Sequence, residues 1–222
     1  DWLYVLTRTD PDAPKHRGVT MFLVPLDDPG VEIQPVYTFM DERTNATFYT
    51  DVRIPDRYRI GEVNGGVKVL SSALSQEQSG GTYHRNIRAM AAAVEDWLQG
   101  REVGGRPQLE DPATLARLAK AYTYANISEG LGHRILATWL AGGADMAFGP
   151  AAKIFSTESF ITVSEDLLDL AAPDSLRRGK EGLGLVEMGY RHSSATTIYG
   201  GTSEVLRSMV AERRLGLPRS RG

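Results

Sequence analysis

The 222-residue chain contains no cysteine, which excludes disulfide bonds, thiolate metal sites and a cysteine nucleophile. The histidines are scattered without the spacing of metal ligands; they are His16, His84, His133 and His192. No apolar run approaches the ~20 residues that are needed to span a bilayer. A formal net charge of −3 argues against a surface that binds nucleic acid or an anionic membrane. The 41% of hydrophobic residues is nevertheless enough to form a core.

The start of the chain lacks two further features. Residue 1 is Asp1 rather than methionine, and no signal-peptide pattern follows it. A strand pattern begins immediately at Trp2, with no turn or helix cap before it. We therefore expect a cytoplasmic protein, and a chain that is a fragment or has lost its N-terminal part.

The first sixty residues show the pattern of short strands joined by turns. Strands are predicted at 3–8, 18–25, 31–36 and 46–54. Prolines, glycines and aspartates separate these segments, and no helical period lies between them. This arrangement predicts an antiparallel meander or a partial β-barrel over residues 1–60.

After Gly65-Gly66 the hydrophobic period changes to that of helices. One long helix is predicted from Val67 to Trp97, weakened at Gly80-Gly81 by about 1 kcal/mol per glycine. Asp111, as an N-cap before a proline, opens a second helix. A third is predicted from Pro150 and a final one after Gly201. The fold class is therefore α+β, with an up-and-down helical bundle over residues 61–222.

Glu77 follows the apolar stripe of the first predicted helix, which consists of Val67, Leu70 and Leu74. A carboxylate on a buried face is costly unless it is paired, so its pKa rises, as a general base near neutral pH requires. If the helix rolls at Gly80-Gly81, Glu77 is instead solvated. The pattern alone leaves both interpretations open.

The segment Thr197–Glu204 contains two adjacent glycines before a helical pattern. Gly200 and Gly201 permit a positive φ and a close approach of another molecule. Thr202 or Ser203 can cap the helix, whose first N–H groups attract anions or carbonyl oxygens. On the residues alone, an ordinary glycine turn before an ordinary helix is the favoured interpretation. Lys153, Glu158 and Glu165 are predicted to form a solvated helix face.

Several motifs in the correct order give the chain a resemblance to acyl-CoA dehydrogenases. They are Pro29-Gly30-Val31, Asp51-Val52-Arg53-Ile54-Pro55, Gly65-Gly66-Val67, Tyr190-Arg191-His192-Ser193, Ile198-Tyr199-Gly200-Gly201-Thr202-Ser203-Glu204 and Ala211-Glu212-Arg213-Arg214-Leu215-Gly216-Leu217-Pro218. Together they cover the chain almost end to end, which makes them more specific than a lone glycine motif.

The resemblance implies a partial middle β-domain and the C-terminal helical domain of that family, without its N-terminal helical domain. It also implies FAD as cofactor and an acyl-CoA substrate, which is oxidised to a trans-2-enoyl-CoA. The family's subunits assemble as dimers of dimers, as homo- or hetero-oligomers, and pass electrons to an electron-transfer flavoprotein.

The resemblance also implies roles for individual residues. Most members carry the catalytic Glu at the position of Gly200, but a minority carries it on the first long helix, which here gives Glu77 as the general base. The Gly200 backbone N–H then donates to the thioester carbonyl. The resemblance places the remaining residues as follows: Gly201, Thr202 and Glu204 at the flavin, Arg101 at the FAD pyrophosphate of a neighbouring subunit, and Tyr199 and Arg191 at the substrate.

Two departures from the usual sequence of the family leave other functions open. Gln78 stands where an arginine is usual, and the glycine-rich adenine-binding run is reduced to Ala171-Ala172-Pro173-Asp174. Both suit a non-catalytic, FAD-binding or structural partner subunit of a heteromeric acyl-CoA dehydrogenase. A flavin oxidase or monooxygenase on the same fold is a third possibility, although the retained Tyr199-Gly200-Gly201-Thr202 motif argues against it.

Overall fold

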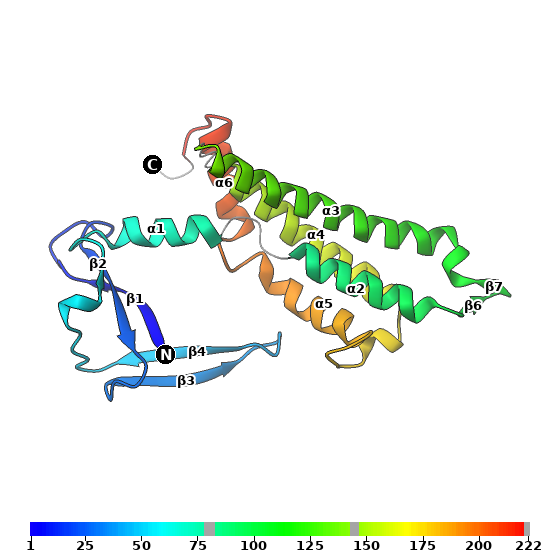
Figure 1. Cartoon of the computed structure of the whole chain (residues 1–222), viewed down its shortest axis with the longest axis horizontal. Helices are drawn as coiled ribbons and strands as arrows, with labels where there is room; N and C mark the ends of the chain where they lie inside the picture. Colours follow the sequence, from blue (N-terminus) through cyan, green and yellow to red (C-terminus); the bar gives the residue numbers. More distant parts are fainter. Residues whose placement is uncertain (78–82, 143–146, 220–222) are drawn as a thin grey trace. The chain divides into compact units, whose positions relative to one another are not determined.

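The structure is a computed structural model that describes residues 1–77, 83–142 and 147–219. The chain divides into two compact units, residues 1–76 and residues 77–222, which are described separately below. The first unit consists of strands and one α-helix, and the second is mostly helical (Figure 1). This confirms the predicted α+β class.

The strands of the first unit form two small antiparallel sheets. One sheet has the order β1-β2-β5, and the other pairs β3 with β4. The bounds are β1 Trp2–Arg8, β2 Val19–Pro25, β3 Val31–Tyr37, β4 Arg43–Tyr49 and β5 Arg59–Ile60. Met21 and Val24 of β2 are buried, whereas the residues of β1 alternate between exposed and half-buried. The predicted antiparallel strands are thus present, and the first three lie within one or two residues of their predicted bounds.

The fourth strand differs from the prediction of 46–54. It begins at Arg43 and ends at Tyr49, because Asp51 has φ 54°, which an extended ladder does not allow. Val52 and Ile54 remain half-buried between exposed neighbours, so the alternation that suggested a longer strand is present without strand pairing.

Helix α1 (Gly66–Glu77) belongs to the first unit except for its last residue. Its start is fixed against the sheet, because the Asn64 N–H donates to Thr20 Oγ1 at 2.8 Å. Gly66 lies so close to Leu6 and to the backbone of β2 that a side chain would collide there. The sequence pattern places this helix in the bundle domain, which is predicted to begin at residue 61, and that boundary stays a prediction.

The described part of the second unit is a bundle of helices with a small hairpin at one end (Figure 1). The helices are α2 Tyr83–Leu98, α3 Pro112–Leu140, α4 Phe148–Leu170, α5 Gly184–Thr196 and α6 Ser203–Arg214. The hairpin consists of β6 Glu102–Val103 and β7 Arg106–Pro107. The core is formed by α2, α3, α4 and α5, with Phe160, Ile87, Met90, Val94, Leu167 and Val186 among its fully buried side chains.

The helix starts at Asp111 and Thr202 follow the predicted capping. The Asp111 carboxylate accepts from the Thr114 N–H at 2.8 Å, and Thr202 Oγ1 accepts from the Val205 N–H at 3.2 Å. The predicted long helix is present as α1 and α2, and Gly80-Gly81 lies outside the described residues. No described helix has the length and apolar content to cross a membrane.

Helix α5 is absent from the sequence-based prediction. Its 13 residues include glycines, serines and threonines, which have low helix propensity. Packing compensates for this, since the missing side chain of Gly189 makes room for Met90 of α2. The helix is therefore stabilised by tertiary contacts that a local pattern does not reveal.

Candidate functional site

The connection between α5 and α6 is a glycine turn at one end of the bundle (Figure 1). Gly200 has φ 65° and Gly201 has φ 99°, conformations that glycine adopts without strain. The Ser203 N–H donates to the Thr197 carbonyl at 3.0 Å and closes the turn. The predicted turn is therefore present, and its two glycines precede the capped start of α6.

The Gly200 N–H has no hydrogen-bond partner among residues 1–77, 83–142 and 147–219. Gly200 is half-buried, so this N–H is accessible to water or to a ligand. Its chemistry suits a carbonyl or anionic oxygen of a ligand, as in an oxyanion hole.

Lys153 of α4 lies under this turn and is only 4% exposed. Its Nζ donates to the carbonyl of Thr196, at 2.8 Å, and to that of Gly201, at 2.7 Å. Burial lowers the pKa of Lys153, and nearby Glu158 opposes that effect. The predicted solvated helix face is therefore wrong for this residue. Lys153 lies seven residues before the core residue Phe160, on the same helix face, and this spacing could have revealed it.

Tyr199 and Glu204 lie on either side of the glycines. The Tyr199 hydroxyl is 3.1 Å from Nε2 of His192, and 39% of Tyr199 is exposed. Hydrogen bonds from the Glu204 backbone N–H and from Thr202 hold the pKa of the Glu204 carboxyl below its usual value. Tyr199 and Glu204 therefore flank the glycine turn, and their roles at the substrate and at the flavin stay predictions.

Arg191 occupies a different environment from Tyr199. Its side chain is almost fully buried and forms a bidentate pair with Glu187, one helical turn earlier, at 2.6 and 2.9 Å. The guanidinium thus helps to fix α5 internally. The role in substrate binding that the family resemblance implies for Arg191 stays a prediction.

Glu77 is the last residue of α1, and the structure gives only the backbone of residues 75–77. Gln78 and the following small residues lie outside the described residues. The orientation of the Glu77 carboxylate therefore stays a prediction.

Arg101 lies at the opposite end of the bundle, after α2. Its guanidinium stacks on Trp97 at 3.9 Å from the ring centroid and donates to Asp174 Oδ2 at 3.0 Å. Asp174 follows α4, whereas Lys153 is near the start of that helix. At 1.5 Å of rise per residue, the two ends are roughly 25 Å apart along α4.

Arg101 lines an open cavity of about 500 Å³. Two further arginines, Arg177 and Arg178, line it together with the first residue of α5, while Asp174 and Glu181 supply negative charge. Guanidinium groups and a helix N-terminus are the donors that suit a diphosphate. The residues present therefore fit the pyrophosphate of a dinucleotide. To bind Arg101, the pyrophosphate has to replace the carboxylate of Asp174 as its partner.

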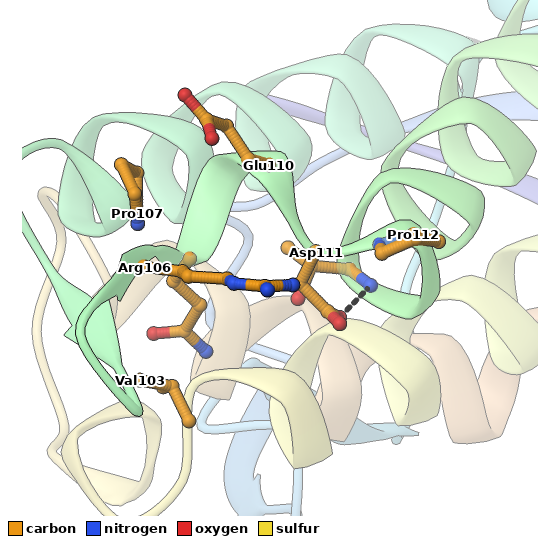
Figure 2. A pocket seen from close by; sticks show the side chains of 8 residues that line it. Val103, Arg106, Pro107, Glu110, Asp111 and Pro112 are labelled. Carbon is orange, nitrogen blue, oxygen red and sulfur yellow. Dashed lines mark hydrogen bonds between the residues drawn. The ribbon is translucent and has the colours of Figure 1, made fainter.

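A second cavity of about 500 Å³ lies beside the β6–β7 hairpin. Val103, Arg106, Pro107, Glu110, Asp111 and Pro112 line it, and the Arg106 side chain extends across it toward Asp111 (Figure 2). This cavity contains none of the predicted site residues. No group of three or more His, Cys, Asp or Glu in the described parts of the chain is arranged to hold a metal ion.

Comparisons with known proteins give a consistent result. The family model "Acyl-CoA dehydrogenase, C-terminal domain" matches residues 64–215. The acyl-CoA dehydrogenase FadE26 of Mycobacterium tuberculosis is 31% identical over 99% of this chain and 58% of its own length. The acyl-CoA dehydrogenase FadE34 of the same organism is 32% identical over 98% of this chain and 29% of its own length. The chain therefore spans little more than half of FadE26 and less than a third of FadE34.

Solved structures agree with the sequence comparisons. The ChsE4–ChsE5 complex from Mycobacterium tuberculosis matches with a TM-score of 0.87 and 30% identity, covering 99% of this chain and 58% of that chain. The Tcur3481–Tcur3483 steroid ACAD matches with a TM-score of 0.88 and 32% identity, covering 99% of this chain and 57% of that chain. The first structure is a complex of two named components, and the second also carries the names of two components.

Proposed function

This chain belongs to the acyl-CoA dehydrogenase family, and we propose that it supplies the C-terminal domain of an enzyme that oxidises an acyl-CoA thioester to a trans-2-enoyl-CoA. The observation that carries the proposal is the turn at Gly200. Its N–H is unpaired among the described residues, next to a capped helix start. Such a donor is suited to the thioester oxygen, on which negative charge develops when the α-proton leaves.

Glu77 is the proposed general base. A proton next to a thioester carbonyl is weakly acidic, so its removal needs a base and a stabilised enolate oxygen together. The chain has glycine at position 200, so this turn offers no carboxylate of its own there. Glu77 supplies the carboxylate from the helix that ends just before residue 78.

FAD is the proposed cofactor, and when bound it supplies the hydride acceptor of the reaction. Thr202 and the first N–H groups of α6 are the proposed contacts at the flavin. Arg101, with Arg177 and Arg178, is proposed to hold the pyrophosphate of an FAD whose flavin lies in a neighbouring subunit. The distance of roughly 25 Å along α4, from Lys153 to the end of the helix near Asp174, supports this division between subunits. We propose an electron-transfer flavoprotein as the electron acceptor.

A second candidate function is that of a non-catalytic subunit in a heteromeric enzyme. The two-component solved relatives favour a heteromeric assembly. The ion pair between Arg101 and Asp174 would weaken FAD binding in such a subunit. The relative described as a steroid ACAD suggests an acyl group with bulky rings, and we include such a thioester in the test.

The test is anaerobic bleaching of the flavin absorbance in the full-length protein, alone and with any co-encoded homologue. The panel runs from short straight-chain acyl-CoAs to a steroid-bearing acyl-CoA. Glu77→Gln is compared with Glu165→Gln, which makes the same change on an exposed position of α4. We expect bleaching in the wild type and the control, and a loss of at least about 100-fold in rate in Glu77→Gln with FAD still bound.

Other results would contradict parts of the proposal. Unchanged bleaching in Glu77→Gln removes this residue as the base. Flavin that binds only when a homologue is present, and bleaching that is insensitive to Glu77, identify the non-catalytic subunit. Oxygen consumption that matches the rate of turnover identifies an oxidase or monooxygenase.

A further inference from the structure

Lys153 contacts both ends of the turn between α5 and α6. Its Nζ donates to Thr196, the last residue of α5, and to Gly201, the second glycine of the turn, at 2.8 and 2.7 Å. These two carbonyls are five residues apart in the sequence. One side chain of α4 thus ties together the end of one helix and the start of the next.

The environment of Lys153 makes a purely space-filling role a poor explanation. The residue is 4% exposed, and no carboxylate among the described residues forms an ion pair with it. Burying an ammonium group without a direct ion pair is costly, and an apolar side chain would fill the same space without that cost. The two carbonyls offset part of this cost by accepting hydrogen bonds, and these bonds also fix the positions of the carbonyls.

Two glycines in succession give the turn its freedom. Gly200 and Gly201 can take positive or negative φ, so the backbone between the helices is not fixed by its own residues. The cap at Thr202 and the bond from Ser203 to Thr197 hold the α6 side of the turn. Lys153 adds a contact from outside this segment, from a helix that is anchored in the core.

We propose that Lys153 is a positioning residue, which holds the Gly200 N–H in the direction that donates to the thioester oxygen. The inference rests on the function proposed above for Gly200. It adds a role for a side chain that is buried beneath the turn and whose hydrogen bonds go to backbone carbonyls. Misplacing a reacting group by about 1 Å costs on the order of 100-fold in rate, so a loosened turn has a measurable effect.

The experiment compares Lys153→Met with Lys120→Met in the full-length flavoprotein, purified with any partner subunit. Lys120 is a matched control, because it pairs with Asp166 at 2.6 Å on the surface of the bundle, between α3 and α4. The first readout is the anaerobic rate of flavin reduction at saturating substrate. We expect Lys153→Met to lower this rate by about 10- to 100-fold, with a smaller change in KM and unchanged flavin content.

The second readout separates positioning from general destabilisation. The thioester carbonyl of the best substrate's enoyl-CoA product is labelled with carbon-13, and its stretching frequency is measured in the bound state by difference infrared spectroscopy. A hydrogen bond to the carbonyl lowers this frequency. We expect a lowered frequency in the wild type and in Lys120→Met, and a partial return toward the free value in Lys153→Met.

The outcomes distinguish this inference from the proposed function. If the wild type itself shows no lowered carbonyl frequency, the Gly200 N–H does not donate to the thioester oxygen. Both the proposed role of Gly200 and the positioning role of Lys153 are then overturned. If the frequency is lowered equally in the wild type and in Lys153→Met, the function stands and the positioning role is overturned. If Lys153→Met does not fold, Lys153→Arg, which keeps the charge and the donors, provides the same comparison, with a smaller frequency change expected.

Discussion

The two ends of the helical bundle use cations in different ways. At the α6 end, Lys153 is buried and its two hydrogen bonds go to backbone carbonyls. At the β6–β7 end, Arg101 has 45% of its side chain exposed and pairs with the carboxylate of Asp174. The first cation fixes a turn, whereas the second borders an open cavity.

This difference separates the interactions that hold the site in place from those that a ligand can replace. A buried donor satisfies backbone groups that are shielded from water fully at Thr196 and partly at Gly201, so removing it lowers the stability of the fold. An exposed ion pair is screened by solvent and exchanges its partner at little cost. The bundle therefore presents a rigid end suited to orienting a reacting group and an adaptable end suited to capturing an anion.

The largest effect is predicted for the core that both ends share. Phe160 is fully buried in α4, between Lys153 and Asp174 in the sequence. Phe160→Ala should lower the free energy of unfolding by about 3–5 kcal/mol, because it leaves a cavity. Urea unfolding followed by circular dichroism measures this. A loss below about 1 kcal/mol, or a loss as large in the control Phe160→Leu, would show that α4 is not the common support of the two ends.

The second prediction compares the two cations directly. Lys153→Met leaves two carbonyls without donors and should cost about 1–3 kcal/mol. Arg101→Met removes an exposed ion pair and should cost less than about 1 kcal/mol. Urea unfolding of both variants at the same pH tests the comparison. Equal losses would show that burial does not separate the two ends.

Tyr122 of α3 is partly buried, so its access to solvent lies between that of buried Lys153 and that of exposed Arg101. Burial, together with the hydrogen bond that its hydroxyl donates to Glu95 at 2.7 Å, raises its pKa from 10.0 to about 12. Because the folded pKa is the higher one, the stabilisation is fully present below pH 10 and is lost as the pH rises toward 12.

Tyr122→Phe should therefore lower stability by about 1 kcal/mol at neutral pH. The difference between the wild type and the variant should shrink above pH 10. Unfolding at a series of pH values measures this difference, and the ultraviolet absorbance of tyrosinate should lose a component that titrates near pH 12. A difference that grows with pH would contradict the assigned direction of the shift.

Local signals in the sequence predicted the parts of the site that depend on local chemistry. The glycine pair, the Thr202 cap and the Asp111 cap each involve residues within a few positions of one another. The first three strands are separated by turn residues, and the third alternates between apolar and polar residues. These features are determined by backbone preferences, which a single sequence displays.

The missed features depend on contacts between distant segments. Helix α5 has weak helix propensity and is held by packing such as that of Gly189 against Met90. Lys153 was assigned to a solvated face because lysine is rarely buried, and its partners lie more than forty residues further along the chain. The end of β4 depends on the positive φ of Asp51. The role of Glu77 stays a prediction of the sequence.

The smallest effect on stability is predicted for Asp174→Asn, and it tests the adaptable end. The amide keeps an acceptor for the Trp97 indole N–H, which donates to Asp174 at 3.2 Å, but removes the charge that competes for Arg101. Stability should change by less than about 1 kcal/mol, since the pair is partly exposed.

Binding of inorganic pyrophosphate or FAD should nevertheless tighten in Asp174→Asn. This gain in affinity should shrink at high salt, because it comes from removed competition between charges. Isothermal titration at low and high salt, with Asp169→Asn as an exposed control near the same helix end, measures this. Weaker binding in Asp174→Asn would mean that the carboxylate orients Arg101 for the ligand instead of competing with it. The two ends of the bundle would then differ only in how deeply their cations are buried.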